Sequence, residues 1–296
     1  MKHQLLHGDC LELLKSVPDD SVNLILCDLP YSLTGQGWDK LLPMSELWPH
    51  YLRVLRKGGK VVLTATNPFA AYLIMSAPKV CPFKYDWAWV KNGPTNFVNA
   101  KKAPMRKKEM ALVFQRETGT YNPQGLVRCV DGKVMKNSKC KMAKKAADGA
   151  ELVGGNYVRN PSECYVQEWT NYPTDVLFFP RDHQLKHRLH PTQKPVALFE
   201  YLIRTYTNPG DVVLDNCAGS FTTTIAAMRS GRSSICMERD EKFFDRGKAR
   251  YEAELNGVEL KGVATNDETF VWRTPQEKAK QRRRDERQEV KQKGLF

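Results

Sequence analysis

The chain has 296 residues, of which 41% are hydrophobic, and it carries a formal net charge of +13 with a pI near 9.3. This length allows one large domain, or a core that carries one inserted module. The basic excess favours a polyanionic partner, nucleic acid before a membrane surface, over a merely soluble basic protein.

Eight cysteines are scattered through the chain without any C-x-x-C spacing, which argues against a zinc site. Cys27 and Cys236 lie inside apolar runs, which predicts that both are buried thiols. This pattern suits a reducing compartment. No apolar stretch approaches the roughly 18 residues of a membrane span, and the N-terminus leads into none. We therefore expect a cytoplasmic protein with no metal and no membrane partner.

The first 115 residues alternate between strand and helix signals, which predicts a mainly parallel sheet with helices on both faces. Leu11, Leu14 and Val17 fall on one helical face. Further helices are expected over 41–54 and 68–75, and buried strands over 22–27, 60–64, 85–90 and 110–115. Residues 1–115 are therefore interpreted as the first half of an α/β core.

Residues 116–188 lose this periodicity, and lysines crowd a stretch with few large apolar side chains: Lys133, Lys136, Lys139, Lys141, Lys144 and Lys145. Such a segment forms little core of its own. We interpret it as an inserted, partly flexible module. The alternative is a solvated loop, because runs of charge often only face water.

Regular patterns return in residues 189–260, the predicted second half of the core. The order is a helix over 196–206, a strand over 211–215, a glycine-containing turn, a helix over 222–229, a strand over 233–238 and a final helix. The extension over 261–296 is basic, with nine Lys or Arg against four Asp or Glu between Arg273 and Lys293. It suits a solvated or disordered end better than a DNA-binding arm.

The first buried strand is followed by Asp28, Leu29, Pro30 and Tyr31. They lie at its carboxyl end, the end of the strands where α/β folds bind ligands. The exocyclic amine of a nucleic-acid base is a poor nucleophile, because its lone pair is delocalised into the ring. The Asp28 carboxylate and the Leu29 carbonyl, held by Pro30, supply two acceptors for its N–H groups. Tyr31 offers a ring for base stacking, worth about 1–3 kcal/mol. A base must leave the duplex to reach this site; the alternative is an ordinary Asp/Pro turn.

A second acidic corner follows the strand over 211–215. Asp215 opens the turn Asp215-Asn216-Cys217-Ala218-Gly219-Ser220, in which Gly219 permits close backbone approach to a ligand. Glu238 ends the next strand, at an offset from Asp215 where nucleotide-binding α/β folds hold ribose hydroxyls. The alternative for Glu238 is an exposed acid at a strand end. No G-x-G-x-x-G follows an early strand, which disfavours a dinucleotide oxidoreductase.

Four segments in this order resemble the motifs of S-adenosylmethionine-dependent DNA amino-methyltransferases of the permuted β class, which modify adenine N6 or cytosine N4. They are residues 6–12, 28–31, 190–195 and 215–220. The resemblance covers most of the chain except about 116–175 and the tail. It implies a Rossmann-like, doubly wound, mostly parallel sheet, with 116–188 as the inserted target-recognition module.

Two positions depart from the family pattern. Leu29 stands where the family usually has proline, but only a backbone carbonyl is needed there. Phe221 stands where the family usually has glycine, a change that either reshapes the turn or weakens cofactor binding. Asp28 as first residue resembles the adenine-N6 enzymes, because cytosine-N4 members more often carry serine.

The resemblance also implies roles for individual residues. Asp28, Leu29, Pro30 and Tyr31 are the catalytic set. The implied cofactor-binding residues are Asp9, Cys10, Asp28, Lys194, Asp215, Asn216, Cys217, Gly219, Ser220, Thr222 and Glu238. The expected DNA contacts are Trp89, Asn92, Lys101, Lys102, Arg106, Lys107, Lys139 and Lys141, although Trp89 suits a core position equally well.

The sequence thus predicts methyl transfer from S-adenosylmethionine to adenine N6 in double-stranded DNA, by base flipping and direct displacement, within a restriction-modification setting. The expected location is the cytoplasm of a bacterial cell or phage-infected host, and a homodimer is possible. Three alternatives stay open: cytosine-N4 methylation, RNA as acceptor, and a DNA-binding protein without turnover on the same fold.

Overall fold

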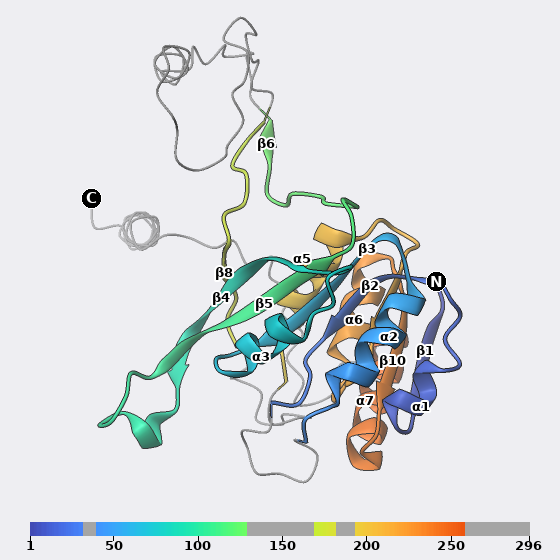
Figure 1. Ribbon diagram of the computed structural model, residues 1–296, viewed down its shortest axis with the longest axis horizontal. Coiled ribbons are helices and arrows are strands. Elements are labelled where there is room, and N and C mark those ends of the chain that lie inside the picture. Colours follow the sequence, from blue (N-terminus) through green and yellow to red (C-terminus); the bar gives the residue numbers. More distant parts are fainter. Residues whose placement is uncertain (32–39, 129–168, 182–192, 258–296) are drawn as a thin grey trace, which may run out of the picture. The chain divides into compact units, whose positions relative to one another are not determined.

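The computed structural model describes residues 1–31, 40–128, 169–181 and 193–257. Contacts divide the chain into two compact units, one of residues 1–122 and 175–296 and the other of residues 123–174. Across the described residues no helix is long and apolar enough to cross a bilayer. The first unit contains an eight-stranded sheet in the order β1-β10-β9-β2-β3-β5-β4-β8 (Figure 1).

The strands of this sheet come from both ends of the described chain. Their bounds are β1 His3–His7, β2 Val22–Cys27, β3 Leu55–Ala65, β4 Phe83–Thr95, β5 Arg106–Gln115, β8 Val176–Phe178, β9 Val212–Asp215 and β10 Ser233–Glu238. Within the described ranges, five pairings between neighbouring strands are parallel, and β5 runs antiparallel to both β3 and β4. The predicted mostly parallel α/β sheet is therefore confirmed.

Helices cover both faces of the sheet, as predicted. The helices of the first unit are α1 Cys10–Leu14, α2 Met44–Val54, α3 Phe69–Ser76, α5 Val196–Tyr206, α6 Thr222–Ser230 and α7 Glu241–Leu255, with the short 3-10 helix η1 at Phe97–Asn99. Buried side chains of α1, α2 and α3 form one core with one face of the sheet. Those of α5 and α6 form a second core with the other face.

Burial explains why these segments adopt their structures. The β2 side chains from Leu24 to Cys27 are fully buried, as expected for a central parallel strand with helices on both sides. Cys27 and Cys236 are buried thiols, as predicted. In α2, Leu47, Tyr51 and Val54 recur at helical spacing and all face the core.

The second unit contains a two-stranded antiparallel sheet of β6 Val127–Arg128 and β7 Trp169–Thr170. The Asn171 side-chain amide donates to the Gly125 carbonyl at 2.7 Å beside it. This unit is shorter than the predicted module over 116–188. The residues on either side of it belong to the first unit. Before it, the Thr120 carbonyl accepts a hydrogen bond from Lys60 Nζ of β3 at 2.8 Å, and after it, β8 pairs with β4.

Candidate active site

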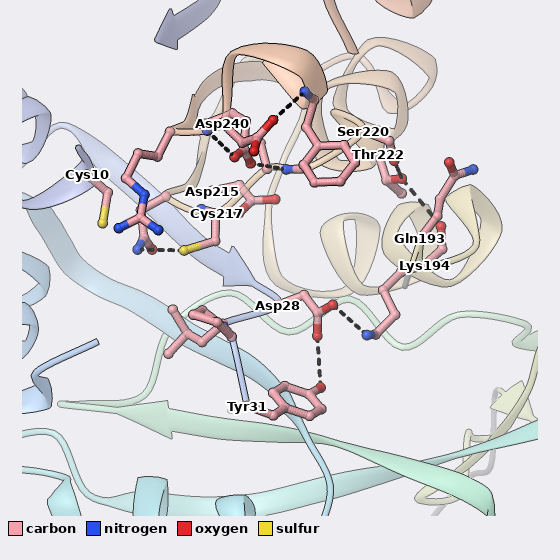
Figure 2. A pocket seen from close by; sticks show the side chains of 18 of the residues that line it. Cys10, Asp28, Tyr31, Gln193, Lys194, Asp215, Cys217, Ser220, Thr222 and Asp240 are labelled. Carbon is pink, nitrogen blue, oxygen red and sulfur yellow. Dashed lines mark hydrogen bonds and ion pairs between the residues drawn. The ribbon is translucent and has the colours of Figure 1, made fainter. Parts of the chain in front are cut away.

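The acidic corners of β2 and β9 lie side by side. β2 and β9 are neighbouring parallel strands, with Leu24 opposite Val213 and Ile25 opposite Leu214. Parallel neighbours end at the same edge of a sheet, so Asp28 and Asp215 meet there. Both line one cavity of about 810 Å³. In Figure 2, Asp28 and Tyr31 face the segment of Asp215 and Cys217 across it.

The Asp28 carboxylate already has several partners in the first unit. Its Oδ1 accepts hydrogen bonds from the Tyr31 hydroxyl at 2.8 Å and from the Thr64 hydroxyl. Its Oδ2 pairs with Lys194 Nζ at 2.5 Å. Burial and the Asp28 charge raise the pKa of Tyr31 well above its usual range, so its hydroxyl stays protonated as a donor. These contacts fix the carboxylate at the cavity wall (Figure 2).

Lys194 belongs to a line of alternating charges. Its ammonium lies 3.5 Å from Glu109 Oε2, and Glu109 Oε1 also pairs with Lys91. Burial alone would lower the pKa of Lys194, but Asp28 and Glu109 outweigh it and raise that pKa. Burial likewise opposes ionisation of Glu109, but Lys194 and Lys91 lower its pKa. The site therefore keeps Lys194 and Glu109 ionised.

The turn after β9 is built around the Asp215 carboxylate. Oδ1 accepts from the Cys217 backbone N–H at 3.0 Å, and Oδ2 accepts from the Thr223 hydroxyl. Asn216, next in the chain, accepts a 2.6 Å hydrogen bond from the buried Tyr51 hydroxyl of α2. Gly219 adopts a left-handed φ of +53°, a conformation that glycine takes at little cost, and its close approach to a ligand stays a prediction.

Phe221 does not enter the cavity. Its backbone is left-handed, with φ +56°, and its fully buried ring lies against Gly247 and Phe244 of α7. The cavity wall at this point is made by the flanking residues Ser220 and Thr222. The Phe221 ring, which stands where the family usually has glycine, is therefore accommodated behind the turn, between α6 and α7.

Arg250 of α7 braces the same turn from behind. It is buried, and its Nη1 donates to the Ser220 carbonyl at 3.0 Å and lies 3.1 Å from Thr222 Oγ1. A buried guanidinium that donates hydrogen bonds to a carbonyl and a hydroxyl holds the backbone in place. The turn is thus fixed from the sheet side by Asp215 and from the helix side by Arg250.

Glu238 and Asp9 line the other side of the cavity. Glu238 accepts from the Gly219 backbone N–H at 2.7 Å and from that of Asp240 at 2.8 Å. Burial raises the pKa of Glu238, although these N–H groups act in the opposite direction. Asp9 caps α1 by accepting from the Leu11 N–H at 2.9 Å. Glu238 is half-buried rather than an exposed acid at a strand end, and both Glu238 and Asp9 line the cavity.

Two thiols face the same space. Cys10 and Cys217 both line the cavity. The Cys217 contact and burial raise the pKa of Cys10. The Cys10 contact acts to lower the pKa of Cys217, but the Cys27 contact and burial outweigh it and raise that pKa. Burial raises the pKa of the adjacent Cys27 to about 12. Cys10 and Cys217 therefore present neutral sulfur to a ligand in the cavity at neutral pH.

The predicted DNA contacts fall into four groups. Trp89 is buried, donates from Nε1 to the Phe179 carbonyl at 2.9 Å, and lines the cavity. Asn92 is exposed and accepts from the Arg181 backbone N–H at 3.2 Å. Four basic residues of the β4–β5 hairpin are all exposed: Lys101 and Lys102 on its turn, and Arg106 and Lys107 at the start of β5. Lys139 and Lys141 lie outside the described residues, as do His190 and Thr192.

Sequence reasoning missed the residues that hold the site from behind. These are Thr64, Lys91 and Glu109 around the catalytic corner, and Tyr51 and Arg250 around the turn. Lys91 and Glu109 carried little signal, because each lies at the polar end of its strand, among other charged or polar residues. Tyr51 and Arg250 carried none, since each occupies an ordinary position on an amphipathic helix.

Comparison with known proteins agrees with this geometry. Residues 22–249 match the N6/N4 methyltransferase family, described as DNA methylase. The DNA adenine methyltransferase YhdJ of Escherichia coli (strain K12) is 30% identical over 261 residues, covering 83% of this chain and 81% of that protein. The type II methyltransferase M.HpaI of Haemophilus parainfluenzae is 23% identical over 268 residues, covering 88% and 77%.

Solved structures share the fold. M1.HpyAVI in complex with SAM has a TM-score of 0.55 at 20% identity, over 83% of this chain and 98% of that one. PvuII DNA methyltransferase, described as cytosine-N4-specific, has a TM-score of 0.55 at 17% identity, over 87% and 94%. At these identities the likeness shows the fold alone.

Fold and cavity together define a Rossmann-like methyltransferase that uses S-adenosylmethionine as cofactor. The chain belongs to the N6/N4 DNA methylase family, whose members include restriction-modification enzymes of type II.

Proposed function

We propose that this DNA methyltransferase transfers a methyl group to N6 of adenine in double-stranded DNA, by base flipping and direct displacement. The meeting of the Asp28 and Asp215 corners in one cavity supports this most strongly. Two observations favour adenine over cytosine: aspartate is the first residue of the catalytic tetrapeptide, and a relative is named as an adenine methyltransferase.

The Asp28 contacts leave a defined place for the substrate amine. A carboxylate has about four lone-pair directions. Among the described residues, Tyr31 and Thr64 occupy two on Oδ1, and Lys194 occupies one on Oδ2. One direction on Oδ2 remains, and we assign it to an N–H of the target base. The second N–H is assigned to the Leu29 carbonyl.

The reaction then needs no covalent enzyme intermediate. With both N–H groups held, the amine lone pair points at the methyl carbon and forms the new N–C bond. The S–C bond of S-adenosylmethionine breaks, its electron pair stays on sulfur, and the nitrogen passes a proton to Asp28. Lys194 pairs with the Asp28 carboxylate and holds it in position to accept this proton, and Tyr31 supplies the ring that supports the base.

The cavity wall fits the cofactor, which supplies an electrophilic methyl group. We assign the methionine part to the turn residues from Asp215 to Thr222, the ribose to Glu238, and the adenine amine to Asp9. Each Glu238 oxygen accepts one backbone N–H, so lone pairs remain for ribose hydroxyls. Cys10 and Cys217 offer neutral sulfur surfaces beside them.

Asp28→Asn tests the catalytic assignment. It keeps the side-chain shape but replaces an acceptor by a donor at one position. Labelled methyl incorporation into DNA should fall by at least about a hundredfold, while S-adenosylmethionine affinity measured by calorimetry stays within about threefold. Asp245→Asn, an exposed position on α7, is the matched control. Near wild-type activity in Asp28→Asn would contradict a catalytic role for this carboxylate.

Cytosine-N4 methylation is the second candidate, favoured by the fold shared with the cytosine-N4-specific PvuII enzyme. Digestion of methylated DNA and identification of the modified nucleoside separates the two, and a parallel assay on RNA tests the acceptor.

The same proposal includes target recognition by residues 116–188, with Lys139 and Lys141 among the contacts, and a homodimer. Single-molecule sequencing of DNA from expressing cells reports the base and its context together.

A further inference from the structure

The β4–β5 hairpin carries a feature that phosphate contacts do not explain. Figure 1 shows this strand pair extending well beyond the rest of the sheet, with η1 in its turn. At the tip, residues 96–105, Phe97 is 66% exposed and Val98 is 96% exposed. Burial of apolar surface is the dominant favourable term in folding, so adjacent exposed apolar side chains on a projecting turn point to a partner.

The charge around these side chains indicates what the partner is. Residues 96–108 contain five Lys or Arg and no Asp or Glu: Lys101, Lys102, Arg106, Lys107 and Lys108. All five are exposed. An apolar point within a purely cationic surface suits a polyanion with an apolar interior, which describes duplex DNA with its stacked bases.

The tip is also continuous with the active-site cavity. Thr95 and Arg106 are paired across the two strands, joined by a 3.1 Å hydrogen bond from Thr95 Oγ1 to the Arg106 carbonyl. Both residues line the cavity. Phe97 lies two residues beyond Thr95, a reach of at most about 7 Å along the backbone. That is about two base-pair steps at 3.4 Å each.

The turn that presents Phe97 is firmly built. Asn96 holds a left-handed conformation with φ +72°, and its Oδ1 accepts from Asn99 Nδ2 at 3.0 Å. The backbone N–H of Ala100 donates to the Phe97 carbonyl at 3.0 Å, and that of Lys102 donates to the Asn99 carbonyl at 2.8 Å. A rigid turn loses little conformational entropy when it binds.

We propose that Phe97 and Val98 form a wedge that enters the DNA base stack beside the target and fills the space left by the flipped base. The surrounding lysines and arginines hold the phosphates on either side. This inference rests on the proposed function, because it places the wedge next to a base that turns into the Asp28 corner. It assigns the hairpin a part in opening the duplex, separate from the chemistry.

A binding assay tests the wedge without knowledge of the recognition sequence. The probes are a fully paired duplex of random sequence and the same duplex with one abasic nucleotide, which needs less unstacking. Wild-type protein should bind the abasic duplex about five- to tenfold more tightly. The double variant Phe97→Ala/Val98→Ala should lose most of this preference. In Lys101→Ala/Lys102→Ala both affinities should fall together, with the preference kept.

A methylation assay provides the second arm, with Met75→Ala as an exposed apolar control on α3. On paired DNA the double variant should lose about five- to a hundredfold in kcat/KM. Mismatching the target base should restore most of that loss, since a mismatched base is already easier to flip. Unchanged S-adenosylmethionine affinity shows that the variant is folded.

Three results would overturn the wedge. The first is a double variant that prefers the abasic duplex as strongly as the wild-type protein does. The second is a double variant that methylates paired DNA as fast as the wild-type protein, and the third is a wild-type dimer that the same substitutions dissociate. The last result, seen by sedimentation, would assign the tip to a second copy of the chain. If wild-type protein methylates no DNA, the proposed function fails, while the abasic preference still decides the fate of the wedge.

Discussion

Phe221 occupies a left-handed backbone conformation that costs an L-residue roughly 1–2 kcal/mol. Burial of its ring offsets this strain, and α7 accommodates the ring only because position 247 is glycine. A Cβ at Gly247 would lie 2.0 Å from the Phe221 ring. The two residues therefore act as a pair, and the family's usual glycine at 221 would remove the constraint on 247.

Gly247→Ala tests this pairing. In the wild-type background it should reduce the free energy of unfolding by about 1–3 kcal/mol, because the ring must shift. In a Phe221→Gly background it should instead be neutral, or stabilising by up to about 1 kcal/mol, as alanine normally is in a helix. Denaturant unfolding of the four proteins measures the coupling. Additive effects would show that the ring and α7 are independent.

At the scale of elements, one buried hydrogen bond joins α2 to the end of β9. Tyr51→Phe removes the donor to Asn216 Oδ1 and leaves that oxygen without its partner in a buried position. The expected loss of unfolding free energy is about 1–3 kcal/mol. S-adenosylmethionine affinity should fall as well, because Asn216 lines the cavity.

The control for this change is Tyr72→Phe on α3, where the tyrosine is partly exposed. It should alter neither unfolding by denaturant nor cofactor affinity measured by calorimetry. Equal behaviour of the two variants would mean that the Tyr51 hydroxyl contributes nothing to the turn.

Most of the core elements could be predicted from sequence, because buried strands and amphipathic helices carry their own patterns. The β4–β5 extension could not, since residues 91–108 are mainly polar and show no alternation that faces a core. β8 could not either, because its three residues are specified by pairing with β4 rather than by local sequence. The acidic corners were found because each ends a buried strand, whereas the contacts of Thr64, Glu109 and Arg250 exist only in three dimensions.

At the scale of the whole molecule, one buried acid affects how stability depends on pH. Burial raises the pKa of Asp215 to about 6 from an ordinary 3.8, although Thr223 and the Cys217 N–H act against it. The folded protein therefore binds this proton more tightly than the unfolded chain. The resulting contribution to stability is complete below about pH 4 and is lost as the pH rises through about 6.

Asp215→Asn should therefore stabilise the protein at about pH 8 by up to about 3 kcal/mol, with the gain vanishing below about pH 4. The asparagine oxygen can still accept from the Cys217 N–H, and its amide can donate to the Thr223 oxygen. Thermal unfolding across pH, with Asp245→Asn as the control, measures this. A gain that does not change with pH would show that Asp215 has an ordinary pKa.

The order of strands in the sheet has a consequence for synthesis on the ribosome. β2 takes one of its neighbours from β9, and β1 pairs with β10, so both early strands wait for segments made roughly 190–230 residues later. At about 5–20 residues per second, that interval is on the order of ten to fifty seconds. During this time the nascent chain holds open strand edges, which are templates for misassembly. Translation speed and holding chaperones will therefore influence how much of this protein matures.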